Sequence, residues 1–340
     1  MKRFFYFLLL ILVCFAIFFL FIGNSKEETI EAPLGLPPVP YPKDNPYSKA
    51  KAELGKKLYF DPCISSNKQI SCATCHAVSH AYKDPKPISE GILGRKGTRH
   101  APTVINAAYN KLQFWDGRAK TLEEQAKGPI ANLNEMTLSR DSKISYEECQ
   151  KRVRENPEYP QMFIEVFGND ACSIDDIVKA IATFERTVLS GNSPYDRYKE
   201  GDKTAMTEEQ IAGYQLFKRV GCNNCHFEPL FTDGRFLNIG IGMDAEHPDL
   251  GRYEITKNEK DYGAFKVPTL RETAKSAPYM HDGSHKTLEE VIDYYDQGGI
   301  PNKNLHPLMK PLHLSEQDKK ALIAFLEALN GEGWQDLELK

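Results

Sequence analysis

Two short stretches with the pattern C-x-x-C-H constrain this chain more than any other feature of its sequence. They read CATCH at residues 72–76 and CNNCH at residues 222–226. In this pattern two thiols add to the two vinyl groups of a porphyrin, which attaches haem c covalently. The thiols here are Cys72, Cys75, Cys222 and Cys225. The sequence therefore predicts two haem c groups.

The histidine that ends each motif follows the second thioether directly, so it lies beneath the iron and can bind it from one face. His76 and His226 are therefore predicted as proximal ligands. A lone C-x-x-C could be a redox dithiol or half of a zinc site, but neither explains a histidine in both copies. The opposite face decides the function, because a sixth ligand makes an electron carrier and an open position admits a small oxidant.

The first 22 residues combine a basic start with a long apolar run. Lys2 and Arg3 precede Phe4–Ile22, which carries no charge and approaches the ~20 residues that span a bilayer. No small-x-small cleavage pattern follows, so an uncleaved membrane anchor is favoured over a cleaved signal peptide. The rest of the chain is then expected on the periplasmic face of the inner membrane, where haem c is attached and disulfides persist.

The overall composition gives no sign of a strongly charged partner. The 43 basic and 47 acidic residues nearly cancel, for a formal net charge of −4, so no nucleic-acid partner is predicted. Outside the two motifs, a disulfide between Cys149 and Cys172 is one alternative, although a sequence cannot establish such a pairing.

The order of the segments predicts two related haem domains behind a tether. Residues 23–46 carry six prolines and no apolar period, which is typical of an extended linker. A helical stretch with the pattern G-x-x-L-aromatic precedes each C-x-x-C-H motif, starting at Gly55 and at Gly213. Such repetition favours two related domains, predicted at 47–200 and 201–332.

The apolar periodicity elsewhere is that of helices. Apolar residues between 174 and 184 recur at i, i+3, i+4 and i+7, with Ser173 or Asp175 as a cap. Residues 315–318 (SEQD) resemble a capping box that opens another helix. Residues 190–207 are polar and turn-rich, so they are predicted as the hinge. Few segments alternate, and the predicted fold class is all-α.

Several motifs around the two haem sequences resemble one bacterial family. They are GTRHAPTVIN at 97–106, QFWDGRA at 113–119, LEEQA at 122–126, GPIANLNEM at 128–136, SPYDR at 193–197, FKVPTL at 265–270 and APYMHDG at 277–283. In this order they are similar to the bacterial dihaem cytochrome c peroxidases and their relative MauG, from about residue 47 to 330. The resemblance implies a first haem that reacts with hydrogen peroxide and a second that relays or stores electrons.

The resemblance also implies that the first iron is open without prior reduction. Reductively activated members carry a distal histidine in the loop that here spans 89–97, and the aligned residue is Ile92, which cannot bind iron. His80 follows His76 by four residues, so it is predicted on the same side as His76, at the surface or facing a propionate. His100 as an iron ligand remains an alternative.

Cleavage of the peroxide O–O bond needs a base that takes a proton from one oxygen and returns it to the other. The resemblance assigns this role to Glu135, with Gln125 and Pro129 in the same pocket. Without the motif, Glu135 would be one more acid on a solvated surface. Trp115 is expected to pack in a core, and the resemblance implies that it also carries electrons between the haems.

The second iron needs a sixth ligand from downstream of its motif. Several methionine, histidine and tyrosine residues qualify by chemistry, Met309 among them. In the family this ligand follows the histidine of Y-x-H-D-G, here His281, by fourteen residues, and it is Met in the peroxidases and Tyr in MauG. That position is Tyr295, which we favour over Met309. A phenolate stabilises oxidised iron, so it would give this haem a low potential.

The family further implies a calcium ion between the haems. Its ligands would be the side chain at position 100 and the backbone carbonyls of Ser276 and Pro278. The family usually has asparagine at position 100, whereas this chain has His100, and calcium prefers oxygen ligands. Calcium is therefore expected either to be lost or to be held mainly by the two carbonyls.

These features predict an anchored, exported dihaem peroxidase. It would reduce hydrogen peroxide to water with electrons from a small cytochrome c, a cupredoxin or a protein side chain. Ile92 and Tyr295 both differ from the residues of the reductively activated peroxidases, and both differences point to the MauG-like branch. The alternative enzyme is therefore a MauG-like oxidase that acts on a partner protein. A non-enzymatic dihaem electron carrier or redox sensor is the third hypothesis, and such a carrier would have no use for Glu135.

Overall fold

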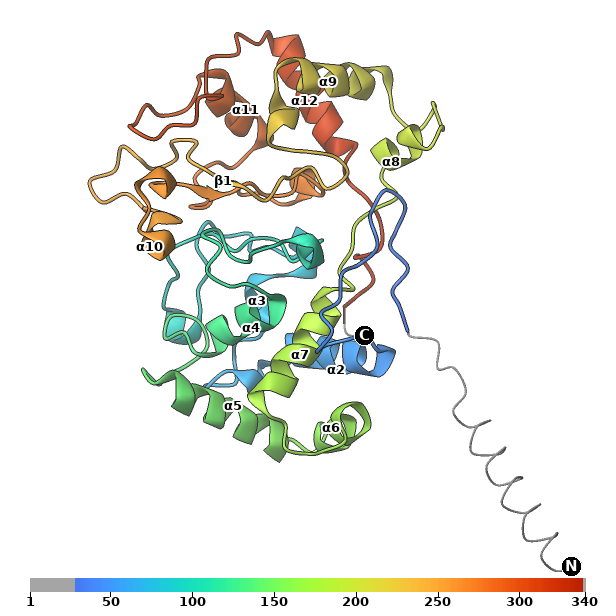
Figure 1. Ribbon diagram of the computed structural model, residues 1–340, viewed down its shortest axis with the longest axis vertical. Coiled ribbons are helices and arrows are strands. Elements are labelled where there is room, and N and C mark those ends of the chain that lie inside the picture. Colours follow the sequence, from blue (N-terminus) through green and yellow to red (C-terminus); the bar gives the residue numbers. More distant parts are fainter. Residues whose placement is uncertain (1–27, 339–340) are drawn as a thin grey trace, which may run out of the picture.

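The computed structural model describes residues 28–338, so the predicted anchor at residues 1–22 lies outside the described part. The described residues form two lobes, one above the other in Figure 1. None of their helices is both long enough and apolar enough to cross a bilayer.

The first lobe is built from helices around the first C-x-x-C-H motif. They are α2 Lys49–Phe60, α3 Cys72–Cys75, α4 Leu122–Ile130, α5 Ser142–Glu155, α6 Pro160–Phe167 and α7 Ile174–Glu185. The elements that follow are α8 Pro194–Lys199, α9 Glu208–Arg219, β1 Phe236–Leu237, α10 Tyr253–Thr256, β2 Phe265–Lys266, α11 Leu288–Asp296 and α12 Glu316–Glu327. β1 and β2 pair antiparallel, with Phe236 opposite Lys266. The predicted class is confirmed in its main feature, because the described chain is mostly helical with one two-residue strand pair.

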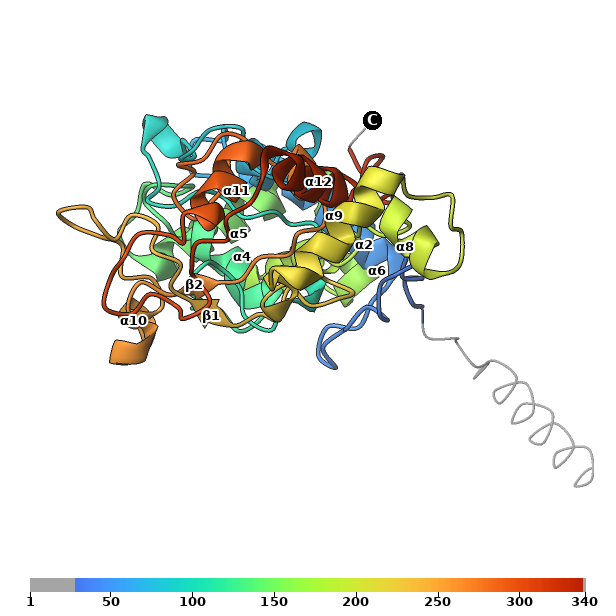
Figure 2. The ribbon, with the colours of Figure 1, turned by 90° about the horizontal axis from the view of Figure 1, so that it is seen from above.

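Each G-x-x-L-aromatic stretch lies in a helix that crosses a second helix at very short range. A Cβ on Gly55 of α2 would lie 1.8 Å from the carbonyl oxygen of Ala180 in α7. A Cβ on Gly213 of α9 would lie 1.8 Å from the carbonyl oxygen of Ala321 in α12, and Figure 2 shows these two helices side by side. Glycine is required at both crossings, because the two backbones touch there. The predicted repeat therefore corresponds to two equivalent helix pairs.

The predicted helix starts are confirmed by their caps. Ser173 accepts a hydrogen bond from the Asp176 N–H at the start of α7. Ser315 and Asp318 form a full capping box at the start of α12. Each cap satisfies backbone N–H groups that the first helical turn leaves without a partner.

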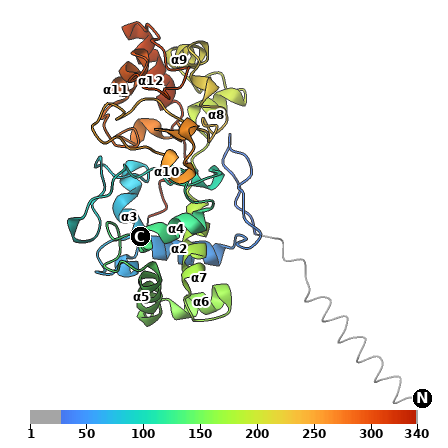
Figure 3. The ribbon, with the colours of Figure 1, turned by 60° about the vertical axis from the view of Figure 1, so that its left-hand side comes forward.

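The described part of the proline-rich segment follows an extended course, as predicted for a linker. It also packs on the surface of both lobes (Figures 1 and 3). The Tyr109 hydroxyl donates to the Pro37 carbonyl at 2.8 Å, and the Asn192 N–H donates to the Leu34 carbonyl at 2.8 Å. The end of the chain also returns to the first lobe, where Trp334 packs against Tyr82 with ring centroids 6.3 Å apart. Cys149 and Cys172 are buried free thiols, so the disulfide considered above is not formed.

The segment predicted as a polar hinge contains helix α8 and a buried ion pair. Asp196 accepts hydrogen bonds from both terminal nitrogens of Arg271, at 2.7 and 2.8 Å. The two side chains are 2% and 0% exposed, respectively. This contact fixes the connection between the lobes, because a bidentate pair in a buried site tolerates little movement.

Replacing Asp196 with alanine should destabilise the protein by about 3–5 kcal/mol, because it leaves the Arg271 guanidinium buried and unpaired. Denaturant unfolding of the holoprotein measures this loss. The matched control is Glu147→Ala, which removes an exposed contact with Lys143 and should cost less than about 0.5 kcal/mol. Equal effects of the two substitutions would contradict a stabilising role for the buried pair.

Candidate active site

The first C-x-x-C-H motif forms the short helix α3 and the residue after it. Ser71 and Thr74 make a capping box at its start, and the His76 N–H donates to the Cys72 carbonyl at its end. The Nδ1 atom of His76 lies 3.2 Å from the carbonyl oxygen of Tyr82. This contact fixes the ring and leaves Nε2 available, which is the arrangement of a metal-bound histidine.

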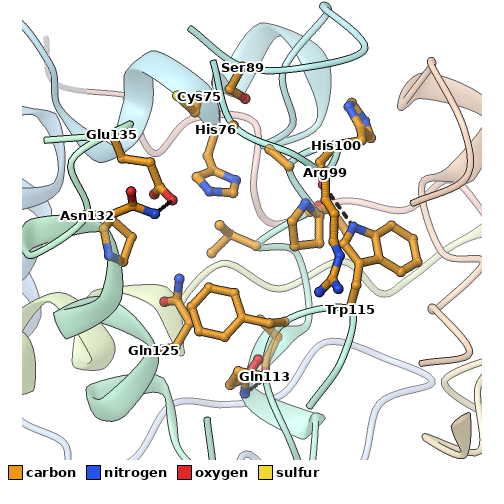
Figure 4. Close-up of a pocket in the computed structure, with 18 of the residues that line it drawn as sticks. Cys75, His76, Ser89, Arg99, His100, Gln113, Trp115, Gln125, Asn132 and Glu135 are labelled. Carbon is orange, nitrogen blue, oxygen red and sulfur yellow. Dashed lines mark hydrogen bonds between the residues drawn. The ribbon is translucent and has the colours of Figure 1, made fainter. Parts of the chain in front are cut away.

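The His76 ring projects into a cavity of about 210 Å³ that opens to solvent (Figure 4). Cys75 and His76 line one side, and Gln125, Pro129 and Glu135 also line it. Neither Cys72 nor Cys75 is paired in a disulfide. A thiol pair, a histidine with a free Nε2 and an adjoining cavity together fit a covalently attached haem c.

Glu135 enters this cavity from the loop after α4. The Asn132 side-chain amide donates to Glu135 Oε1 at 2.5 Å, and Figure 4 shows the two side chains on one side of the His76 ring. Burial raises the pKa of the Glu135 carboxyl, while Arg118 and the Asn132 hydrogen bond act in the opposite direction. A carboxyl group whose pKa is raised towards neutrality is well suited to accept and return a proton.

Ile92 and Pro129 have no side-chain atom that can bind iron, and the His100 ring is engaged elsewhere. Ile92 is fully buried, and its N–H donates to the Glu135 carbonyl at 2.8 Å. Pro129 lines the cavity from within α4. The Nδ1 atom of His100 lies 3.2 Å from the Lys86 carbonyl oxygen, and the ring points away from Glu135 in Figure 4.

His80 is exposed, and its Nδ1 atom is 3.0 Å from the hydroxyl of Ser79. Its predicted surface position is confirmed, but the predicted reason is wrong. The helix ends at Cys75, and a separate 3₁₀ turn at Val78–His80 follows. Helical spacing from His76 therefore does not apply.

The second motif repeats the geometry of the first. The Nδ1 atom of His226 lies 2.9 Å from the carbonyl oxygen of Phe231, which again leaves Nε2 available. Cys222 and Cys225 belong to the same motif, and neither is paired in a disulfide. These residues fit a second haem c by the same criterion as the first.

Tyr295 of α11 lies near this second motif, close to Cys222 and Cys225. Burial, together with the neighbouring Cys222 and Cys225, raises the pKa of the Tyr295 phenol well above its ordinary value. The preceding Tyr294 is engaged elsewhere, since its hydroxyl donates to the Ile239 carbonyl at 2.8 Å. Met309 packs over the Gly299 backbone, with its Cε 2.9 Å from where a Cβ would be.

The two carbonyls that were expected to hold calcium accept hydrogen bonds from a lysine. The Lys83 ammonium donates to the Ser276 carbonyl at 2.7 Å and to the Pro278 carbonyl at 2.9 Å. His100, the third expected ligand, is buried with an unpartnered Nε2. This donor set does not fit calcium, because a divalent cation at the two oxygens would face an ammonium group already bound there. Of the two alternatives given for calcium, retention by these carbonyls is the one that this donor set does not fit.

Trp115 lies where the two lobes meet. Its indole N–H donates to the His100 carbonyl at 2.8 Å (Figure 4), and its own carbonyl accepts from the Lys266 N–H at 2.8 Å. His100 in turn donates its N–H to the His281 carbonyl at 2.7 Å. Trp115 is thus fixed through its side chain and its backbone to segments that join both lobes.

A second internal repeat explains why the surroundings of the two motifs differ. The pattern D-G-x-x-K-T-L-E-E occurs at residues 116–124 and at 282–290, and a threonine cap from each copy starts α4 and α11. Aligning the copies puts Pro129 of α4 at the position of Tyr295 of α11. The same helix position therefore offers a phenol at the second motif and no ligand atom at the first. This repeat can be read from the sequence alone.

Two further polar residues of the site were not predicted. Asn132 fixes Glu135, as described above. Glu185 of α7 lines the first cavity with one carboxylate oxygen unpartnered, and burial raises the pKa of its carboxyl to about 8. Its sequence context is an ordinary amphipathic helix, so no local signal marks it.

Comparison with known proteins supports this geometry. The model of the di-haem cytochrome c peroxidase family matches residues 49–204. Cytochrome-c peroxidase IdrP1 of Pseudomonas sp. (strain SCT) is 37% identical, with 91% of this chain and 89% of that protein covered. Methylamine utilization protein MauG of Methylorubrum extorquens is 38% identical, with 86% and 82% covered.

A solved structure is also similar. It is that of a MauG-like protein associated with microbial copper homeostasis, with a TM-score of 0.83 and 31% identity over 90% of this chain and 96% of that one. Sequence and fold agree with the paired haem motifs and with the cavity above His76. The chain therefore belongs to the di-haem cytochrome c peroxidase family of oxidoreductases.

Proposed function

We propose that this protein reduces hydrogen peroxide to water at its first haem. Each turnover consumes two protons and two electrons and releases two water molecules, with the electrons supplied by a small redox protein such as a cytochrome c or a cupredoxin. The observation that carries the proposal is the half-buried Glu135 carboxyl in the cavity of His76, where Pro129 offers no iron ligand. An electron carrier with two six-coordinate haems has no need of this arrangement.

The protein residues supply positioning and proton transfer. Bound haem c supplies the iron to which peroxide binds and from which it takes electrons. Glu135 accepts the proton of one peroxide oxygen and donates it to the other, which leaves as water. Asn132 holds the carboxylate through its 2.5 Å hydrogen bond, and Gln125 of α4 offers an amide to the same cavity. Pro129 brings no competing ligand into the cavity, and Ile92, buried beside the Glu135 backbone, cannot bind iron.

The remaining residues would connect the two haems. Tyr295 is proposed as the sixth ligand of the second haem, and Trp115, fixed between the lobes, as the relay of electrons to the first. The same proposal holds that the apolar N-terminal segment exports the haem domains and retains them at the membrane. Haem c attachment requires an extracytoplasmic location, which is what supports it.

A MauG-like oxidation of a partner protein is the second candidate. It is favoured by the position of Tyr295 near Cys222 and Cys225, since a phenolate lowers the potential of a haem and so disfavours uptake of electrons from a carrier. The likeness to MauG supports the same reading. Both candidates share the open first site and differ in the source of the electrons.

Addition of one equivalent of hydrogen peroxide to the as-isolated ferric protein tests the proposal. We expect an immediate change in the absorption of one high-spin haem, followed by oxidation of two equivalents of reduced cytochrome c or cupredoxin. Two low-spin haems that ignore peroxide until partly reduced would contradict the open site. If the peroxide-oxidised protein takes no electrons from reduced cytochrome c or from reduced cupredoxin, the result would favour the second candidate, oxidation of a partner protein.

A further inference from the structure

The ammonium group of Lys83 lies at the contact between the two lobes. Lys83 follows Tyr82, whose carbonyl holds the His76 ring, and so belongs to the loop of the first haem motif. Its two acceptors, the carbonyls of Ser276 and Pro278, belong to the loop before Y-M-H-D-G in the second lobe. The lysine and its first acceptor are 193 residues apart in the chain, so this contact joins the lobes directly.

The surroundings of this ammonium resemble those of a bound metal ion more than those of an ordinary ion pair. Lys83 is 7% exposed, and both of its hydrogen bonds are buried. Burial lowers the pKa of Lys83 to about 7, with no carboxylate acting in the opposite direction. The ring of Tyr279 lies 5.7 Å away and adds an aromatic face. Two carbonyl oxygens and a π face are thus the groups that contact the ammonium.

His100 forms the third side of this site, as an imidazole that does not compete for the cation. Burial and the nearby Lys83 lower the pKa of His100 to about 4, so the ring is neutral at physiological pH. Its backbone carbonyl accepts the Trp115 indole N–H, at 2.8 Å. His100 therefore connects the two features, because its ring lies near Lys83 and its backbone carbonyl fixes Trp115.

A second lysine repeats this contact from the other lobe. The Lys266 ammonium donates to the Leu112 carbonyl at 3.0 Å, and Lys266 is also buried. Leu112 lies four residues before Asp116, and Pro278 lies four residues before Asp282, in the two copies of the D-G-x-x-K-T-L-E-E repeat. Each lobe thus offers an equivalent carbonyl to a lysine of the other lobe.

We propose that the Lys83 ammonium is a built-in cation that takes the place of a calcium ion between the lobes, so that this chain joins its two haem lobes without a bound metal. Calcium needs six to eight oxygen ligands at 2.3–2.6 Å, whereas two carbonyls and an aromatic face satisfy an ammonium. The proposal concerns the contact between the lobes and holds whichever substrate the first haem oxidises.

The metal content of the holoprotein tests this proposal without any variant. The two-haem protein is dialysed against calcium chloride or against EGTA, gel-filtered, and measured by elemental analysis and thermal unfolding. We expect calcium well below one ion per chain after both treatments and the same unfolding midpoint in both. Retention of one calcium per chain, with a lower midpoint after EGTA, would overturn the proposal.

The Lys83→Ala variant tests the role of the ammonium itself, with Lys86→Ala as its control. Lys86 lies on the same loop, but its side chain is exposed and pairs with Glu90. We expect Lys83→Ala to lower the unfolding midpoint by about 5 °C or more, because it leaves two buried carbonyls unpaired. Added calcium or ethylammonium should then restore part of that loss in Lys83→Ala alone.

Two results would count against the role of Lys83. One is an unchanged midpoint in Lys83→Ala, which would mean that the two hydrogen bonds contribute nothing. The other is a lowered unfolding midpoint that neither calcium nor ethylammonium restores, which would mean that the packing of the side chain matters and its charge does not. Both measurements follow unfolding and metal content, so they remain valid if peroxide reduction is not the activity.

Discussion

Glu135→Gln should lower kcat/KM for hydrogen peroxide by roughly 10²–10⁴, the usual contribution of a positioned general acid–base group. Glutamine keeps the size of the side chain and can still bond to Asn132, but it can neither accept nor return the peroxide proton. The haem content and the ferric spectrum should be unchanged, because Glu135 is not expected to bind iron. Stopped-flow mixing with peroxide measures the effect.

The pH profile separates a proton-transfer role from a packing role. The pKa of the Glu135 carboxyl is raised by burial, so this base is protonated at a higher pH than an ordinary glutamate. The rate should therefore fall as the pH drops through that raised value, and this acid limb should be absent from Glu135→Gln.

Glu90→Gln is the matched control for Glu135→Gln, since Glu90 precedes Gly91 of the cavity wall but pairs with Lys86 in solvent. It should react with peroxide as the wild type does. A Glu135→Gln variant with an unaltered rate would mean that another group moves the proton, and the buried Glu185 would be the first candidate.

Tyr295→Phe should convert the second haem from a six-coordinate, low-spin centre into one that has lost its tyrosine ligand. Loss of a phenolate removes a donor that stabilises ferric iron, so the midpoint potential of this haem should rise, on the order of 0.1 V. Electron paramagnetic resonance and potentiometric titration of the holoprotein measure the two changes.

Tyr294→Phe is the control for Tyr295→Phe. Tyr294 is the adjacent residue on α11, but its hydroxyl bonds to the Ile239 carbonyl, so its removal should leave the spectrum and the potential alone. If Tyr295→Phe has no effect and Met309→Leu abolishes the low-spin signal, then Met309 is the ligand and the argument for a MauG-like second haem fails.

Local patterns in the sequence predicted much of the fold. The helices α7 and α12 and their serine caps followed from apolar spacing and cap chemistry. The repeated glycine before each motif predicted two related helical units, and the structure explains it by two helix crossings that leave no room for a Cβ. The polar segment at 190–207 was interpreted as a hinge because the sequence does not reveal that Asp196 pairs with Arg271.

The candidate site was predictable in so far as its chemistry is local. Haem attachment uses two thiols and a histidine within five consecutive residues, so the sequence alone identified Cys72, Cys75 and His76 and their counterparts. Glu135, Tyr295 and Trp115 came from resemblance, because nothing in their own neighbourhood distinguishes them from surface or core residues.

By itself, the sequence predicted where two haems would attach and which helices would surround them, because both depend on residues that are close in the chain. Only the tertiary structure decided what meets across the lobes. Lys83 and its carbonyl partner at Ser276 are 193 residues apart, and their contact depends on how the two lobes pack. Calcium at those carbonyls stayed an open alternative because a sequence lists possible ligands without showing which buried charge already contacts them.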